Sequence, residues 1–259
     1  GQKVTLTITD GSSTITTTGT SLAVTDSVWT KTVNISALAD GNIDITADVS
    51  DLAGNPATQA TKTLIKETVA PTLAIDNPLM TDNIVNNTEK SAVVISGTSN
   101  AEDDQIVRLI ITDGSTPPIS ITVNPTVTLG AWTYTANMSL WADGTITITA
   151  DVFDKAGNPA AQATKTLIKD TVAPTLAIDD LLMGDDKVND VEKTAVVISG
   201  TSNAENGQRV ALAITDGVTT INDTVTVTGG SWQTAGLDIS ALADGTVTIT
   251  ADVSDLAGN

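Results

Sequence analysis

The segment Thr145-Ile146-Thr147-Ile148-Thr149-Ala150-Asp151-Val152 decides the fold class, because polar and apolar residues alternate along its whole length. Successive side chains of a β-strand point to opposite faces of a sheet. One face of this segment therefore carries aliphatic side chains, and the other carries threonines and an aspartate. The pattern predicts a strand that covers a core with one face and meets water with the other.

Further short strands are predicted around this segment in the stretch 69–169, with turn signals between them. They are expected at residues 72–76, 92–96, 106–111, 119–123, 132–136 and 163–168. No part of the stretch has helical periodicity of useful length, apart from a short helical turn expected at 139–144. About seven short strands in roughly a hundred residues predict an all-β, immunoglobulin-like β-sandwich.

The same unit returns at a spacing close to a hundred residues. Ile-Thr-Asp-Gly stands at 8–11, 111–114 and 214–217, and an Asp-x-Ala-Gly-Asn loop ends at residues 55, 158 and 259. This spacing is the length of a whole domain rather than of a solenoid repeat. We therefore expect tandem Ig-like domains end to end: a first repeat at 1–67 that lacks its first two strands, a complete second repeat at 68–170, and a third repeat at 171–259 that lacks its last strand.

Composition argues against several classes of function. The chain has no cysteine and no histidine, which removes disulfides, thiolate metal sites and the usual general base. Without a nucleophile elbow, a phosphate loop or a dinucleotide fingerprint, we do not expect an enzyme. The net charge of −19 argues against nucleic acid and anionic membrane surfaces as partners. No apolar run approaches the roughly 18 residues of a membrane span.

The acidic residues have two interpretations. They keep a surface-exposed protein soluble, or they bind a hard cation. Calcium takes carboxylate, amide and backbone oxygens, and many of these acids recur at fixed places in the repeat. Neither the EF-hand loop nor the glycine-rich nonapeptide repeat is present, so a calcium site would be assembled from separate loops.

Sandwich topology predicts which loops meet. The first strand starts at one end of the domain and the seventh finishes at the other, so tandem domains stack end to end. The loop after the first strand, the loop before the sixth strand and the outgoing linker then face the next repeat. The candidate calcium ligands at the second junction are Asp76, Asp82, Asn83, Asn86, Glu89, Asp143, Asp170 and Asp255. Those at the first junction are Glu67, Asp154 and Asn158. Those of the third repeat, facing a further copy, are Asp179, Asp185, Asp186, Asn189 and Glu192.

A simpler interpretation applies to several of these positions. Gly and Asn are ordinary turn formers, so Asp51, Asp154 and Asp255 also fit turns that bind nothing. Asp170 and the loop 82–89 also fit purely structural roles. Asp10, Asp113 and Asp216 are expected in hairpin turns. The recurring Trp29, Trp132 and Trp232 are expected in the core, with stacking on a ligand as the alternative.

Four phrases, repeated in register, cover essentially the whole chain. They are residues 82–89 with their counterpart 185–192, Ile-Ser-Gly-Thr at 95–98 and 198–201, Ala-Asp-Gly at 142–144, and the Asp-x-Ala-Gly-Asn loop with the acidic-Thr-Val-Ala-Pro linkers at 67–71 and 170–174. These phrases resemble the bacterial immunoglobulin-like repeats of giant type I-secreted, biofilm-associated surface adhesins. In that family the first linker residue is usually Asp, and Glu67 departs from it.

The resemblance implies a non-catalytic, extracellular stalk on a bacterial surface. Its domains string into long fibres that calcium stiffens at or near the junctions, and the fibre projects an adhesive tip. The partners of each repeat are then the neighbouring repeats of the same chain, and the sequence does not identify the ligand of the tip.

Two other functions fit the same residues. In one, a domain face binds polysaccharide, ice or another cell through outward threonine rows, or through Tyr134 and Trp141, which occur only in the second repeat. In the other, the chain is a subunit of an extracellular filament, sheath or S-layer. A strand from a neighbouring subunit would then complete an open sheet.

Overall fold

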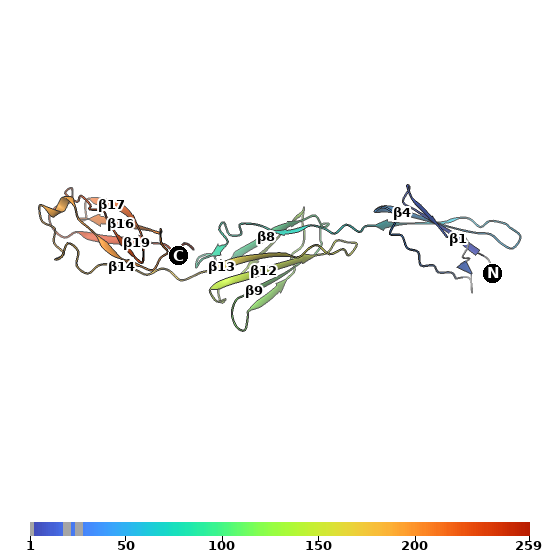
Figure 1. The fold of residues 1–259 in the computed structure, drawn as a ribbon, viewed down its shortest axis with the longest axis horizontal. Coiled ribbons are helices and arrows are strands. Elements are labelled where there is room, and N and C mark those ends of the chain that lie inside the picture. The colour runs from blue at the N-terminus through green and yellow to red at the C-terminus, as the bar shows by residue number, and fades with distance from the viewer. Residues whose placement is uncertain (1–2, 18–21, 24–27) are drawn as a thin grey trace. The chain divides into compact units, whose positions relative to one another are not determined.

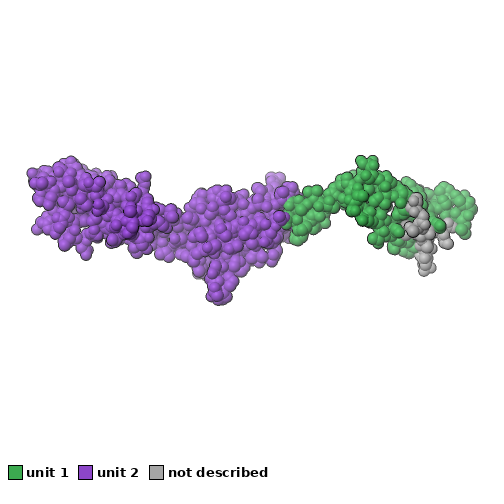
Figure 2. Space-filling view, viewed as in Figure 1, with its two compact units in different colours: residues 1–71, 153–160 green, residues 72–152, 161–259 purple. Residues whose placement is uncertain are grey.

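The computed structural model describes residues 3–17, 22–23 and 28–259 (Figure 1). The regular elements of this part of the chain are strands, with a single 3-10 turn, η1 (Glu192–Thr194). The chain forms two compact units, one of residues 1–71 with 153–160 and one of residues 72–152 with 161–259 (Figure 2). The predicted all-β class is confirmed. The repeat boundaries at 67/68 and 170/171 stay a prediction, and we keep the repeats only as names for these ranges.

The first repeat contributes one antiparallel sheet. Its strands are β1 (Lys3–Thr9), β2 (Thr14–Thr16), β3 (Leu22–Ala23), β4 (Gly41–Val49) and β5 (Ala60–Lys66). The order is β2-β1-β4-β5, and β3 also pairs with β1. Val4, Leu6, Ile8 and Ile43 are buried on one face, whereas Leu64 of β5 is 47% exposed. The described part of this unit has no second sheet that could cover Leu64.

The second repeat is a two-sheet sandwich. Its strands are β6 (Leu73–Ile75), β7 (Ile84–Val85), β8 (Val93–Ser99), β9 (Val107–Asp113), β10 (Ser120–Val123), β11 (Ala131–Ala136), β12 (Gly144–Val152) and β13 (Ala163–Lys169). One sheet has the order β11-β8-β6 and the other β10-β9-β12-β13-β7. The core lies between them, where Leu109, Ile111, Ile148 and Leu167 are fully buried. Leu167 stands one repeat length after Leu64, so the second sheet accounts for the difference in burial.

The third repeat has the same two-sheet arrangement. Its strands are β14 (Leu176–Ile178), β15 (Ser199–Ser202), β16 (Arg209–Thr215), β17 (Thr220–Thr226), β18 (Ser231–Gln233) and β19 (Thr248–Val253). The sheets have the orders β14-β15-β18 and β17-β16-β19. Ile198, Val210, Leu212 and Ile214 form the centre of its core.

All seven strands predicted for the second repeat are present, and the prediction missed one. Two-residue β7 lies in the stretch 77–90 that the sequence predicts as a loop, and it pairs in parallel with β13. A strand this short shows no alternation, so the sequence carries no signal for it. The helical turn expected at 139–144 is an ordinary hydrogen-bonded turn without helix. None of the helices in the described part of the chain has the length and apolar character needed to cross a bilayer.

Two of the three recurring tryptophans are core residues, as predicted. Trp132 and Trp232 are each 3% exposed, whereas Trp29 is 39% exposed. Trp132 lies on β11 and packs against the neighbouring strand β8. The described part of the first repeat contains no strand in the position of β8, which explains why Trp29 is not covered. Trp141 is 8% exposed, so most of its surface is unavailable to a ligand.

The glycine of the Ile-Ser-Gly-Thr phrase makes room for the core tryptophan. A Cβ atom on Gly97 would overlap both the carbonyl oxygen of Ala74 and the ring of Trp132. Gly200 stands in the same relation to Ala177 and Trp232. The recurrence of this glycine in the middle of a strand therefore reflects close approach of an indole ring, because only a residue without a side chain fits there.

Replacing Gly97 by alanine is expected to destabilise the second repeat by about 1–3 kcal/mol or more, since the added methyl group overpacks the core. Urea unfolding followed by tryptophan fluorescence measures the change. The matched control is Gly114→Ala, where a Cβ atom meets only the carbonyl oxygen of Thr145, at 3.5 Å. Equal stability of the two variants would contradict the steric explanation.

Candidate functional site

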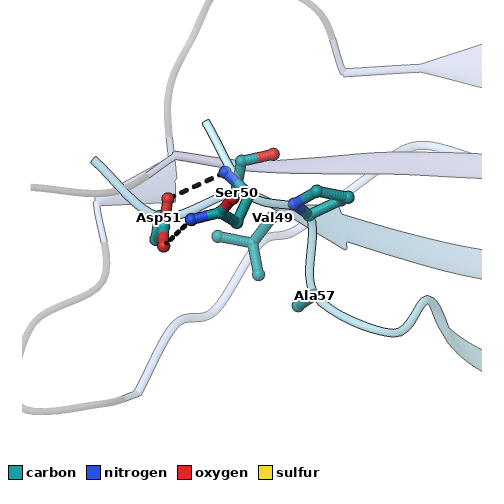
Figure 3. Close-up of a pocket in the computed structure, with 6 residues that line it drawn as sticks. Val49, Ser50, Asp51 and Ala57 are labelled. Carbon is teal, nitrogen blue, oxygen red and sulfur yellow. Dashed lines mark hydrogen bonds between the residues drawn. The ribbon is translucent and has the colours of Figure 1, made fainter. Parts of the chain in front are cut away.

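Each Asp-x-Ala-Gly-Asn loop is closed by its own aspartate. Asp51 Oδ1 accepts hydrogen bonds from the backbone N–H groups of Ala53 and Asn55 at 2.9 and 2.8 Å. Asp51 Oδ2 accepts another from Asn55 Nδ2 at 2.8 Å. Figure 3 draws this loop beside a hollow lined by Val49, Ser50, Asp51, Asn55, Pro56 and Ala57. The carboxylate acts as a turn acceptor here, as the simpler interpretation of the sequence expects.

The later copies close their loops in the same way. Asp154 accepts hydrogen bonds from the backbone N–H and Nδ2 of Asn158 at 2.7 and 2.8 Å. Asp255 accepts the same pair from Asn259 at 2.9 and 3.1 Å. Burial raises the pKa of Asp154, but the hydrogen bonds from Asn158 outweigh it and hold the pKa below its usual value. The aspartate is therefore most stable in its ionised, acceptor form.

The loop asparagine also reaches the linker that precedes its own repeat. Asn158 Nδ2 donates to the carbonyl oxygen of Glu67 at 3.2 Å, and Asn259 Nδ2 donates to the carbonyl oxygen of Asp170 at 3.0 Å. Sequence reasoning placed these asparagines and linker acids together, and the structure does so too. The contact, however, uses the backbone of the acidic residue rather than its carboxylate.

The aspartate of the Ala-Asp-Gly phrase holds the first residues of the linker from the other side. Both oxygens of Asp143 accept hydrogen bonds from Thr171, and Lys169 Nζ donates to Oδ1. The Lys169 side chain is only 3% exposed. Burial raises the pKa of Asp143, but the hydrogen bonds from Lys169 and Thr171 more than offset this and lower it. A calcium ion bound by Asp143 would have to displace these donors.

The first repeat contains the same network. Asp40 accepts hydrogen bonds from Lys66 and Thr68, and the bond from Lys66 is the main reason that the pKa of Asp40 falls to about 2. Because the folded pKa lies below the ordinary value of 3.8, the ionised carboxylate favours the fold. This contribution is fully present above pH 3.8 and is lost as the pH falls towards 2. Sequence reasoning missed this network, although a Lys-acidic-Thr triplet spans the start of both linkers, at 66–68 and 169–171.

The other candidate acids of the second repeat form local hydrogen bonds. Asp76 accepts from Ser96 Oγ, and Asp82 accepts from the backbone N–H of Ile84. Asn83 Oδ1 accepts from the backbone N–H of Leu79 at 3.0 Å.

Asn86 and Glu89 cap each other. Asn86 Oδ1 accepts from the N–H of Glu89, and Glu89 Oε2 accepts from the N–H of Asn86. This reciprocal pair is the capping-box arrangement, which explains the three-residue spacing of the Asn-x-x-Glu phrase.

The third repeat reproduces these local bonds. Asn189 and Glu192 cap each other next to η1. Asp179 accepts from Ser199 Oγ, and Asp186 accepts from the N–H of Leu182. Asp185 accepts from the N–H of Lys187 at 3.1 Å.

At the second junction the structure brings together some of the predicted ligands. Asn86 lies against the 255–259 loop, because its Nδ2 donates to the carbonyl oxygen of Ala257 at 3.0 Å. The backbone N–H of Asp170 donates to the carbonyl oxygen of Val85 at 3.0 Å. In the part of the chain that the structure describes, no three acidic side chains gather closely enough to hold a metal ion. A calcium ion there would rely on amide and backbone oxygens beside single carboxylates, which are ligands that calcium accepts. These residues stay predicted ligands.

Asp143→Asn is expected to destabilise the second repeat by about 1–3 kcal/mol, because the buried ammonium group of Lys169 loses its counter-charge. Thermal unfolding at neutral pH measures this. The control is Asp151→Asn, which removes an exposed ion pair with Arg108 at 3.8 Å and is expected to cost about 0–1 kcal/mol. If both variants unfold like the parent chain, the network around Asp143 does not hold the linker.

Comparison with known proteins places the chain in a family. The family model of the bacterial Ig-like domain (group 3) matches residues 27–124 and 130–259. No curated protein shows significant similarity to the chain.

The solved structures that are similar to this chain include three of large bacterial or adhesion proteins. One is a tetra-tandem repeat in the extending region of a large adhesion protein, with 26% identity and a TM-score of 0.36, over 100% of this chain and 64% of that one. Another is a Ca2+-stabilised adhesin that helps an Antarctic bacterium reach out and bind ice, with 26% identity and a TM-score of 0.39, over 98% of this chain and 65% of that one. The third is a 1.5-MDa bacterial ice-binding adhesin, with 23% identity and a TM-score of 0.39, over 98% of this chain and 85% of that one. The chain thus spans less than two thirds of the length of the first two. On the match to the family model, this chain belongs to the family of bacterial Ig-like domains of group 3.

Proposed function

We propose that this chain is a non-catalytic spacer in the extracellular stalk of a bacterial surface adhesin, where tandem repeats project an adhesive tip away from the cell. The observation that carries the proposal is that equivalent residues of the same type hold both linkers through the same kinds of hydrogen bond. Asp40 holds Thr68 and Asp143 holds Thr171, while Asn158 and Asn259 hold the preceding carbonyl groups. The same hydrogen bonds hold both linkers, as expected for a chain that is lengthened by repeating one domain.

The use of the acidic residues also favours a structural role over catalysis. A general acid or base needs a carboxyl group that exchanges protons near neutral pH. The recurring aspartates instead accept several backbone and side-chain hydrogen bonds each, and the pKa values of Asp40, Asp143 and Asp154 are lowered. They therefore stay ionised as the pH changes near neutrality and serve as fixed acceptors.

We further propose that calcium stiffens the stalk at or near the junctions. The net charge of −19 makes the apoprotein self-repulsive, and Asp170 stands at the second linker between the loops that carry Asn86 and Asp255. Bound calcium would neutralise these carboxylates and give both repeats a shared ligand. The ligand types fit, since hard cations prefer oxygen and the chain offers neither thiolate nor imidazole.

Calcium is expected to raise the melting temperature of the chain. At about 10 times the dissociation constant, linkage gives roughly 1.4 kcal/mol per site. Differential scanning calorimetry in chelator, in magnesium and in calcium measures the shift, which magnesium should not reproduce because it demands tighter geometry. Asp170→Asn should reduce the calcium shift, and Asp252→Asn on β19 should not. An unchanged melting temperature in calcium would remove calcium from the proposal.

One observation favours direct surface binding as a second candidate function. On the outer face of the second repeat, cross-strand neighbours form a row of hydroxyl groups made of Ser120, Thr112, Thr147 and Thr166. If this row binds, the chain should co-sediment with insoluble polysaccharide and Thr147→Lys should abolish the binding. The spacer proposal expects neither the parent chain nor the variant to bind.

A further inference from the structure

Asparagine residues connect the second repeat to the third. Asn86 Nδ2 donates to the carbonyl oxygen of Ala257 at 3.0 Å, and the backbone N–H of Asn87 donates to Asn259 Oδ1 at 2.8 Å. Asn259 Nδ2 donates in turn to the carbonyl oxygen of Asp170 at 3.0 Å. These hydrogen bonds all lie within one compact unit and join the loop before β8, the linker and the 255–259 loop. We call Asn86, Asn87 and Asn259 with these acceptors the asparagine clasp.

The chain also contains equivalent asparagines that lie outside the clasp: Asn189 is the counterpart of Asn86, and Asn55 is the counterpart of Asn259. Asn189 makes the same local bonds as Asn86, since its Oδ1 accepts from the N–H groups of Val191 and Glu192 and its own N–H donates to Glu192. In the described residues, Asn189 has no hydrogen bond to another repeat. Asn55 bonds to Asp51 as Asn259 bonds to Asp255, again without a linker carbonyl among the described residues. The local structure of each loop therefore forms without the clasp.

Exposure differs between the 255–259 loop and the 51–55 loop. Asp255 and Ala257 are 8% and 6% exposed and therefore buried, whereas Asp51 and Ala53 are exposed. Gly258 packs against the clasp, because a Cβ atom on it would lie 3.7 Å from Asn86 Nδ2. The 255–259 loop thus packs against the preceding repeat and linker, and the amide hydrogen bonds satisfy polar groups at this contact.

The chemistry of the clasp requires a carboxamide. Asn259 Nδ2 faces the Asp170 carbonyl oxygen and Asp255 Oδ2, which are both acceptors, while Asn259 Oδ1 faces the N–H of Asn87. Only a side chain that donates and accepts fits this position, and a carboxylate does not. Asn158 stands in the same place at the first linker, with Nδ2 3.2 Å from the Glu67 carbonyl oxygen and 2.8 Å from Asp154 Oδ2.

We propose that the asparagine clasp fastens the second repeat to the third, and that it holds without a metal ion. The partner surface is the turn of the Asp-x-Ala-Gly-Asn loop, which presents a carbonyl oxygen and an amide oxygen to the preceding repeat. The proposal rests on the spacer role and deepens it, but it does not depend on calcium. Calcium and the clasp are then separate contributions to the stiffness of the joint.

The decisive comparison is Asn86→Asp against Asn189→Asp in the whole chain. Aspartate keeps the Oδ1 acceptor that caps the turn and replaces the Nδ2 donor by a charged oxygen. Both variants introduce the same charge at the same place in their own repeat, so they disturb it alike. Spin labels go on Thr122→Cys and Thr224→Cys, which lie on exposed strand positions of the second and third repeats. Only these sites react, since the chain has no cysteine of its own. Distances between the labels are recorded by double electron–electron resonance in excess chelator.

The proposal expects a narrow distance distribution for the parent chain in chelator, a broad one for Asn86→Asp, and an unchanged one for Asn189→Asp. Hydrogen exchange of the Asp170 and Thr171 amides should accelerate roughly two- to tenfold in Asn86→Asp alone, as expected for the loss of one hydrogen bond. A broad distribution for the parent chain, or equal distributions for the two variants, would overturn the clasp.

A second pair covers the case in which Asn86→Asp does not fold. Asn259→Asp is compared with Asn55→Asp, with the same labels on Thr122→Cys and Thr224→Cys. Only Asn259→Asp should broaden the distribution. Adding calcium to the same samples tests the proposed stiffening separately, because a narrow distribution in chelator with no response to calcium would keep the clasp and reject the calcium sites.

Discussion

The junctions depend on the hydrogen bonds that fix the first residues of each linker. Ordering the backbone of one residue costs about 1–2 kcal/mol, and a typical hydrogen bond returns about 1 kcal/mol. A linker residue therefore stays ordered only if several bonds act on it together. Thr171 is held through both its N–H and its hydroxyl group by Asp143, and Asp170 is held through both its N–H and its carbonyl group. The buried ammonium group of Lys169 fixes Asp143 in turn.

The same constraint explains how a chain with a net charge of −19 folds around its carboxylates. Many of the recurring aspartates are surrounded by donors: Asp51, Asp154 and Asp255 by their own loops, and Asp40 and Asp143 by a lysine and a threonine. Carboxylates that accept several hydrogen bonds are stabilised in the charged form. These aspartates thus close turns and anchor linkers, and the proposed calcium sites would use some of the same carboxylates together with Asp170.

Sequence reasoning could predict the strands, because the alternation in Thr145–Val152 and its neighbours reports directly on sheet faces. It could not predict β7, which is too short to alternate, nor the contact of Gly97 with Trp132, which depends on strand pairing. For the site, topology indicated that Asn86, Asp170 and the 255–259 loop would meet, and they do. Sequence could not show that the amide nitrogens and backbone carbonyls make the contact, because residue types alone do not specify which atom faces the partner.

The central claim is that the second linker holds the second and third repeats in a fixed relation. Residual dipolar couplings of backbone amides test it most directly, because rigidly joined domains share one alignment tensor. When the couplings are measured on the whole chain in the presence of calcium, the account predicts that one alignment tensor fits residues 68–170 and 171–259 together. Separate tensors of different magnitude for residues 68–170 and 171–259 would show that the repeats swing independently, and would contradict the account.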